Sequence, residues 1–146
     1  MNKILSYTIL VCLYLTVQNT SLQARDPKSI LDMLDDPAVE QQVLGMTDIF
    51  ELKYNDEIKK LILDYTTFGK RGSEIILNRS NYYFPIIEKI IEEQKLPHEL
   101  KYLSVVESGL RPSVKSKAGA VGLWQFMSAT ARMYDLHIAS SNDERK

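Results

Sequence analysis

Apolar residues recur at helical spacing through the second half of the chain, and this recurrence constrains the fold more than any other feature. Apolar side chains follow Asn55 at positions 58, 61, 62 and 65, and asparagine is a favourable residue to precede a helix. Between Tyr82 and Glu93, isoleucines gather on one side and charged residues on the other. No segment alternates convincingly between apolar and polar residues, as a half-buried strand would. The sequence therefore predicts an all-α fold.

Glycines and prolines predict where these helices begin and end. Gly69–Gly72 predicts the end of the first helix, and a short helix is predicted at residues 73–77. Pro85 suits the first turn of the helix that comes next. The residues from Pro97 to about Glu107 are apolar nearly all round, which predicts a buried helix.

The N-terminal part of the chain predicts export, followed by a connecting segment. Lys3 and an apolar run over residues 4–17 are typical of a signal peptide, and the run is short for a membrane span. We expect residues 1–24 to be a signal peptide and the mature chain to reach the periplasm or cell envelope; an uncleaved membrane anchor is the alternative. Residues 25–49 are expected to form a linker or N-terminal arm, with a short helix that ends at Gly45.

The composition argues against several classes of protein. The 146 residues suffice for one domain, and a formal net charge of −1 argues against a nucleic-acid-binding protein. Cys12 is the only cysteine and lies in the predicted signal peptide, so we expect no disulfide in the mature chain. His98 and His137 show no metal-ligand spacing. We therefore expect no metal and no cofactor.

Glu107 is the residue whose surroundings predict chemistry. It follows Leu103 by four residues and Leu100 by seven, so it shares a helix face with both. It also lies at the predicted C-terminus of the helix, where the macrodipole is negative. Burial and the dipole both disfavour the ionised form, and a protonated carboxyl is what a general acid requires. The alternative is a glutamate that turns outward at a helix end, and position alone leaves both interpretations open.

The sequence around Glu107 carries a spaced motif. Its fixed positions are Leu103, Glu107-Ser108, Pro112, Ser116, Gly122-Leu123-Trp124-Gln125-Phe126 and Ala131. The motif closely resembles the signature of the lytic transglycosylase (SLT domain) family. Leu96-Pro97-x-Glu99-Leu100, together with Trp124, most resembles the membrane-bound lytic murein transglycosylase D branch of that family.

The resemblance implies a fold, a reaction and a partner. The implied fold is an all-α, lysozyme-like helical domain of the goose-type lysozyme and transglycosylase kind. The implied reaction cleaves the bond between N-acetylmuramic acid and N-acetylglucosamine in peptidoglycan glycan strands and leaves a 1,6-anhydro-muramyl product. Glu107 would be the single general acid/base, and Ser108 and Gln125 would contact the substrate. Membership of the membrane-bound branch leaves a peripheral membrane association open.

Family members continue beyond the position of Lys146 with helices that carry an Ala-Tyr-Asn motif. We therefore expect residues 50–146 to be the N-terminal portion of the domain, with its C-terminal part missing. Two other functions stay open, namely a non-catalytic peptidoglycan-binding remnant and a lysozyme-type muramidase. A hydrolase normally uses a second carboxylate. The nearest one downstream is Asp135, which we expect to be a solvated residue at a helix end.

Several residues of the motif also have a purely structural interpretation. The Ser108 hydroxyl could bond locally at the end of the helix. Gly119 and Gly122 either let the backbone approach a sugar or simply form a turn. Trp124 and Phe126 are expected to be core residues, as aromatic residues in an apolar segment usually are.

A basic loop follows the acid. Arg111, Lys115 and Lys117 all lie within ten residues after Glu107. In one interpretation they meet the anionic stem peptides of peptidoglycan, and in the other they belong to a solvated loop.

Overall fold

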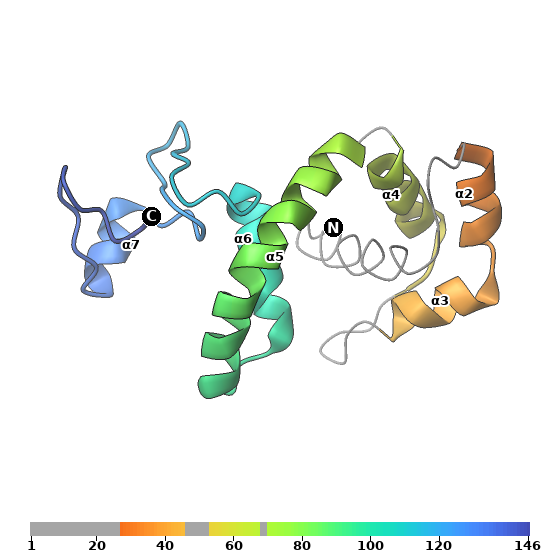
Figure 1. Ribbon diagram of the computed structural model, residues 1–146, viewed down its shortest axis with the longest axis horizontal. Helices are drawn as coiled ribbons and strands as arrows, with labels where there is room; N and C mark the ends of the chain where they lie inside the picture. The colour runs from red at the N-terminus through yellow and green to blue at the C-terminus, as the bar shows by residue number, and fades with distance from the viewer. Residues whose placement is uncertain (1–26, 46–52, 68–69) are drawn as a thin grey trace. The chain divides into compact units, whose positions relative to one another are not determined.

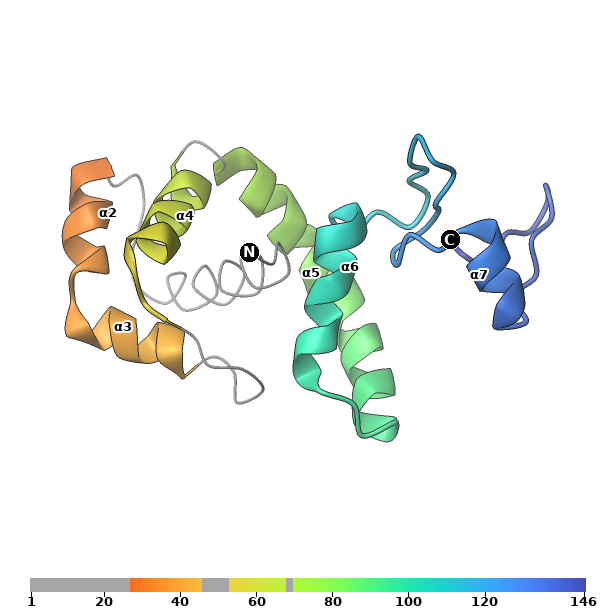
Figure 2. The same cartoon turned by 180° about the vertical axis from the view of Figure 1, so that it is seen from behind.

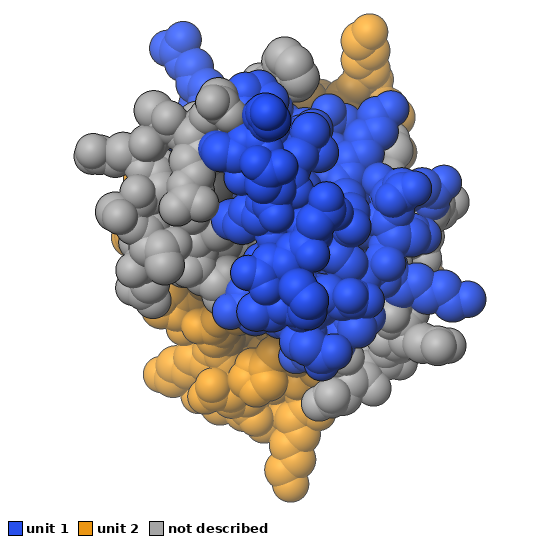
Figure 3. All heavy atoms as spheres, turned by 90° about the vertical axis from the view of Figure 1, so that its right-hand side faces the viewer, with its two compact units in different colours: residues 1–77 blue, residues 78–146 orange. Residues whose placement is uncertain are grey.

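The computed structural model describes residues 27–45, 53–67 and 70–146, and the predicted signal peptide lies outside these ranges. The described residues form helices and isolated β-bridges, with no strand among them (Figure 1), so the all-α prediction is confirmed. The chain divides into two compact units, Met1–Leu77 and Asn78–Lys146 (Figure 3). Within the described ranges, no helix has both the length and the apolar character that a membrane span requires.

Unit 1 contains three short helices, and a side chain caps the start of two of them. They are α2 (Pro27–Leu34), α3 (Pro37–Leu44) and α4 (Asp56–Thr66). The Asp36 carboxylate accepts a hydrogen bond from Ala38 N at 2.8 Å at the start of α3. Asn55 caps α4, because its side-chain oxygen accepts from Ile58 N at 3.1 Å. The predicted helix start at Asn55 and the predicted helix end at Gly45 are both confirmed.

The core of unit 1 is apolar and draws on all three helices. Its buried residues are Ile30, Leu34, Val43, Ile58 and Ile62. The Tyr54 hydroxyl donates to Leu34 O at 2.6 Å and ties the end of α2 to the start of α4. The expected linker or N-terminal arm at residues 25–49 stays a prediction. Within it, α2 and α3 are two ordered helices. Each places apolar side chains in the core, which orders a short and polar segment.

α5 (Lys70–Glu93) is one continuous helix of 24 residues, and it replaces the two shorter helices that the sequence predicts. The prediction that residues 69–72 separate two helices is wrong for Gly72, because Gly72 lies inside α5. Pro85 lies in the interior of α5 and not in a first turn. It cannot donate the backbone hydrogen bond to Asn81 O. Both residues are exposed, so water can satisfy that carbonyl and the helix continues.

The helical part of unit 2 packs α6 beside α5 (Figures 1 and 2). After α5 come the 3-10 helix η1 (His98–Leu100), α6 (Lys101–Ser108) and α7 (Ser128–Met133). Phe84 of α5 meets Tyr102 of α6 edge to face, with ring centroids 5.6 Å apart. Glu88 of α5 forms an ion pair with Lys101, whose ammonium lies 5.4 Å from the Phe84 ring centroid. These contacts fix the helix that carries Glu107.

α6 is buried on one side only. Its buried residues are Tyr102, Ser104, Val105 and Ser108. Leu100, just before α6, is 38% exposed. The prediction of a buried helix from Pro97 to about Glu107 therefore holds for one side of α6 only. The side of α6 that is buried contains two serines, whose small side chains allow close packing.

Candidate functional site

Glu107 lies in the last turn of α6, on its exposed side. The helix ends at Gly109, whose φ of 60° is left-handed and whose amide donates to Val105 O at 2.8 Å. The predicted helix end is confirmed, but the predicted burial is wrong, since neither Leu100 nor Leu103 on the same face is buried. The alternative, a glutamate turned outward at a helix end, describes this placement. Such a carboxyl is accessible to a large ligand.

Ser108 is buried, and its hydroxyl bonds within the chain. Its Oγ donates to Ser104 O at 2.9 Å and accepts from Arg111 N at 3.1 Å. These two bonds join the end of α6 to the loop that follows it. The structural interpretation therefore accounts for this hydroxyl, and the contact of Ser108 with substrate stays a prediction.

Two tight turns lie beyond the end of α6. In the first, Ser116 Oγ accepts from Ala120 N at 3.0 Å, and Ser116 N donates to Ala120 O at 2.9 Å. Gly119 lies in this turn with a left-handed φ of 92°. In the second, Val121 and Phe126 exchange both backbone hydrogen bonds at 3.1 Å. The loop is thus closed twice by hydrogen bonds within itself.

Gly122 and Gln125 hold the second turn together. Gln125 Nε2 donates to Gly122 O at 2.9 Å and to Val114 O at 3.2 Å. Gly122 has a φ of 90°, and a Cβ at this position would lie 1.4 Å from Arg145 O. The close backbone approach that Gly122 permits is therefore made by the chain itself. The Gln125 amide nitrogen thus bonds to two carbonyls of the loop. The contact of Gln125 with substrate stays a prediction.

Arg145 fastens these turns to the start of α7. Its Nη1 donates to Ser128 Oγ at 3.0 Å and to Phe126 O at 3.3 Å. Its Nε and Nη2 donate to the Asp143 carboxylate at 2.8 and 2.7 Å. The two side chains are only 6% and 12% exposed, respectively. Hydrogen bonds from Arg145 lower the pKa of Asp143 to about 2, so the carboxylate stays ionised and holds the guanidinium in place.

The remaining predicted residues lie closer to solvent. Trp124 and Phe126 are half-buried, so the prediction that they are core residues is wrong. Asp135 is exposed and follows α7, as predicted. His98 and His137 are exposed as well. In the part of the chain that the structure describes, no group of three or more histidine, cysteine or acidic side chains could hold a metal ion.

Sequence reasoning missed two arginines that bond to the backbone of the segment after Glu107. Arg145 holds the turns, and Arg79 Nη1 donates to Gly109 O at 2.9 Å at the end of α6. The sequence signals are an Asp-x-Arg pair at residues 143–145 and an arginine on a largely apolar helix face. The Asp-x-Arg pair does form an ion pair, but neither signal identifies the carbonyls of Gly109 and Phe126, which lie 30 and 19 residues away from Arg79 and Arg145 in sequence.

Residues 84–146 match the family model described as the Transglycosylase SLT domain. The matched segment contains Glu107, Ser108 and Gln125. The described residues form helices and no strand, which is consistent with the all-α, lysozyme-like fold of such a domain.

The chain is also similar to a protein of Alteromonas sp. (strain M-1) named "Putative tributyltin chloride resistance protein". The two are 29% identical over 93 residues, which cover 64% of this chain and 42% of the relative. The match therefore spans less than half of the relative's length. No solved structure matches the chain.

Proposed function

We propose that this protein is a peptidoglycan lytic transglycosylase with Glu107 as its single general acid/base. The observation that carries the proposal is the match of residues 84–146 to the Transglycosylase SLT domain, within which Glu107 is an exposed carboxyl at the end of an ordered helix. We further propose that the protein acts in the periplasm or cell envelope, where peptidoglycan lies.

The proposed reaction uses the Glu107 carboxyl for two proton transfers, first as an acid and then as a base. The Glu107 carboxyl protonates the oxygen that links N-acetylmuramic acid to N-acetylglucosamine, and the glycosidic bond breaks through an oxocarbenium-like state. The resulting carboxylate then takes the proton of the muramyl C6 hydroxyl as that oxygen attacks the anomeric carbon. A 1,6-anhydro ring forms and no water is consumed.

A single carboxylate suffices for this sequence of steps, and the chain is compatible with it. No aspartate or glutamate lies between Ser108 and Tyr134. The next acidic residue, Asp135, is exposed and lies beyond α7. A retaining hydrolase would need a second carboxylate about 5 Å from the first. Ser108 and Gln125 are proposed to contact the sugar, on the strength of the family resemblance.

The decisive experiment compares Glu107→Gln with the unaltered protein on purified peptidoglycan. We expect release of 1,6-anhydro-muropeptides, detected by mass spectrometry, to fall by a factor of about 10² to 10⁴. Glu92→Gln is the matched control, because Glu92 is also an exposed glutamate near a helix end in unit 2. It should release product at the unaltered rate.

Other outcomes identify the alternatives. Products with reducing ends would indicate a lysozyme-type muramidase. Binding to peptidoglycan without any release would indicate a non-catalytic binding module. Full activity in Glu107→Gln would overturn the proposed role of this residue.

A further inference from the structure

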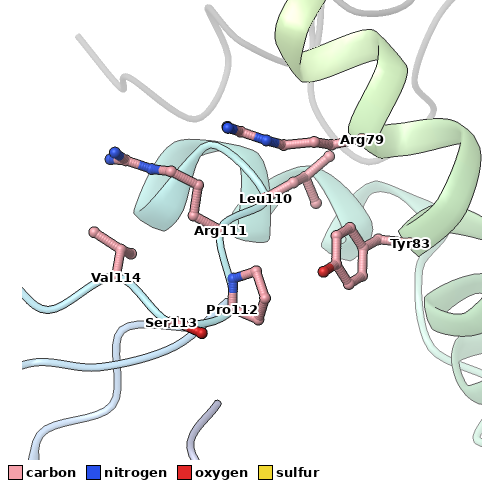
Figure 4. Close-up of a pocket in the computed structure, with 7 residues that line it drawn as sticks. All are labelled: Arg79, Tyr83, Leu110, Arg111, Pro112, Ser113 and Val114. Atoms are coloured by element: carbon pink, nitrogen blue, oxygen red, sulfur yellow. The ribbon is translucent and has the colours of Figure 1, made fainter.

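A pocket of about 400 Å³ lies beside the end of α6. α5 contributes Arg79 and Tyr83 to its lining, and residues 110–114 contribute the rest (Figure 4). Leu110, Pro112 and Val114 are apolar, whereas the two arginines, Tyr83 and Ser113 supply hydrogen-bonding groups. The pocket therefore combines concentrated positive charge with a partly apolar wall.

Both arginines are held in place by backbone carbonyls. Arg79 Nη1 donates to Gly109 O at 2.9 Å, and Arg111 Nε donates to Ser108 O at 2.8 Å. These carbonyls end α6 and have no partner within the helix. Figure 4 shows the two side chains extending in the same direction. Each guanidinium has five N–H donors, so most of the donors on each remain for a ligand.

Among the residues that the structure describes, no carboxylate forms an ion pair with Arg79 or Arg111. The ion pairs in the described part of the chain involve Lys59, Lys101 and Arg145. Capping of the helix end accounts for one hydrogen bond from each of Arg79 and Arg111. It does not account for the fact that both arginines line the same pocket. An anion that enters the pocket would meet groups already ordered by the fold, which lowers the entropy cost of binding.

We propose that this pocket binds a carboxylate of the short peptides carried by the glycan strand. The proposal rests on the proposed function, because that function makes a peptide-bearing glycan the substrate. A guanidinium matches a carboxylate with two parallel hydrogen bonds, and Tyr83 and Ser113 can donate further ones. Leu110, Pro112 and Val114 can contact the small apolar side chains of such a peptide. The part of the lining that follows α6 begins at Leu110, three residues after Glu107 in the chain.

The test measures binding to peptide-bearing glycan strands before and after their peptide carboxylates are converted to amides. Glu107→Gln serves as the background in every measurement, so that the strands are not consumed. We expect binding to native strands to be about tenfold tighter than to amidated strands. This preference should weaken as the salt concentration rises.

Variants then locate the preference. In Arg111→Gln and Arg79→Gln the preference for native strands should fall to threefold or less, and Arg111→Lys should retain part of it. Lys117→Gln is the matched control, since Lys117 is an exposed cation of the same loop that does not line the pocket. It should keep the tenfold preference. Circular dichroism checks that each variant is folded; if Arg79→Gln is not, the two Arg111 variants decide.

If the Glu107→Gln protein binds native and amidated strands equally well, the proposal is overturned. The same holds if adding Arg111→Gln leaves the tenfold preference for native strands unchanged. These outcomes are distinct from failure of the proposed function. That failure would appear as absent product release by the protein with Glu107 intact, whereas the carboxylate preference is measured without any turnover.

Discussion

The helical core of unit 1 and the segment after α6 in unit 2 are ordered by different forces. In unit 1, Leu34, Val43 and Ile62 are at most 1% exposed and are packed against other apolar side chains. In residues 109–146, side chains such as Gln125 and Arg145 donate hydrogen bonds to backbone carbonyls of the turns. The first region relies on burial of apolar surface. In the second, Leu110, Val121 and Ala131 are buried as well, and directed bonds from side chains to the turns add to that burial.

The two kinds of order tolerate change differently. Apolar packing depends on volume, so a lost methyl group weakens a helix pair by a graded amount. The turns depend on backbone geometry, so one atom in the wrong place displaces several bonds together. Four substitutions test this comparison, and amide hydrogen exchange can assign each effect to residues 27–66 or to residues 109–146.

Gly122→Ala should have the largest effect. Its Cβ would meet Arg145 O, and the positive φ of 90° adds strain. We expect a loss of about 4 kcal/mol of local stability in residues 109–146, measured by hydrogen exchange. Gly72→Ala is the control, because a Cβ there meets nothing within 4 Å. It lies in a helix, so it should stabilise the protein by about 0.5 to 1 kcal/mol. A mild effect of Gly122→Ala would show that the turns adapt as a packed core does.

Leu34→Ala should come next. Leu34 is fully buried, and its truncation leaves a cavity in unit 1. We expect a loss of about 3 kcal/mol, seen as faster exchange in α2 and α4 and unchanged exchange in the turns after α6. Leu31→Ala on the same helix should cost less than about 1 kcal/mol, since Leu31 is 45% exposed. Equal exchange changes in both regions would contradict the proposed difference between them.

Asn55→Ala removes a cap without touching the core. The Asn55 side chain accepts from Ile58 N, and alanine cannot. The expected cost is about 1 kcal/mol, measured by chemical unfolding, with faster exchange limited to the first turn of α4. Asn55→Asp keeps an acceptor and should restore the stability. If alanine is neutral, packing alone sets the start of this helix.

Asp143→Asn should have the smallest effect at neutral pH and a distinct dependence on pH. Hydrogen bonds from Arg145 lower the pKa of Asp143 from 3.8 to about 2 in the folded chain. Its ionised form therefore contributes stability above about pH 4, and that contribution is lost as the pH falls toward 2. The gap in melting temperature between the unaltered protein and Asp143→Asn should narrow over that range.

The sequence predicts the helical class and much of the local capping, because both depend on nearby residues. Asn55 marks a helix start for a reason visible within one turn of chain, since its side chain accepts from Ile58 N. The sequence misplaces the break at Gly72, because the apolar residues of α5 outweigh the cost of one glycine. The sequence also predicts that Glu107 is buried, whereas it is exposed. Which side of a helix is buried depends on the neighbouring elements that cover it. The contacts of Arg145 with the carbonyls of Gly119 and Phe126 could not be predicted from pattern, because carbonyl acceptors exist at every residue.

The Arg145 contacts also have a consequence for the order in which the chain folds. Helices such as α6 close through bonds between residues four apart, which form in microseconds or less. The Arg145 guanidinium instead meets Ser128 and Gly119, which are 17 and 26 residues away in sequence. Closing such loops costs more chain entropy, so these contacts should form later. We therefore expect the helix that carries Glu107 to form early in folding, and the turns beyond it to reach their final geometry last.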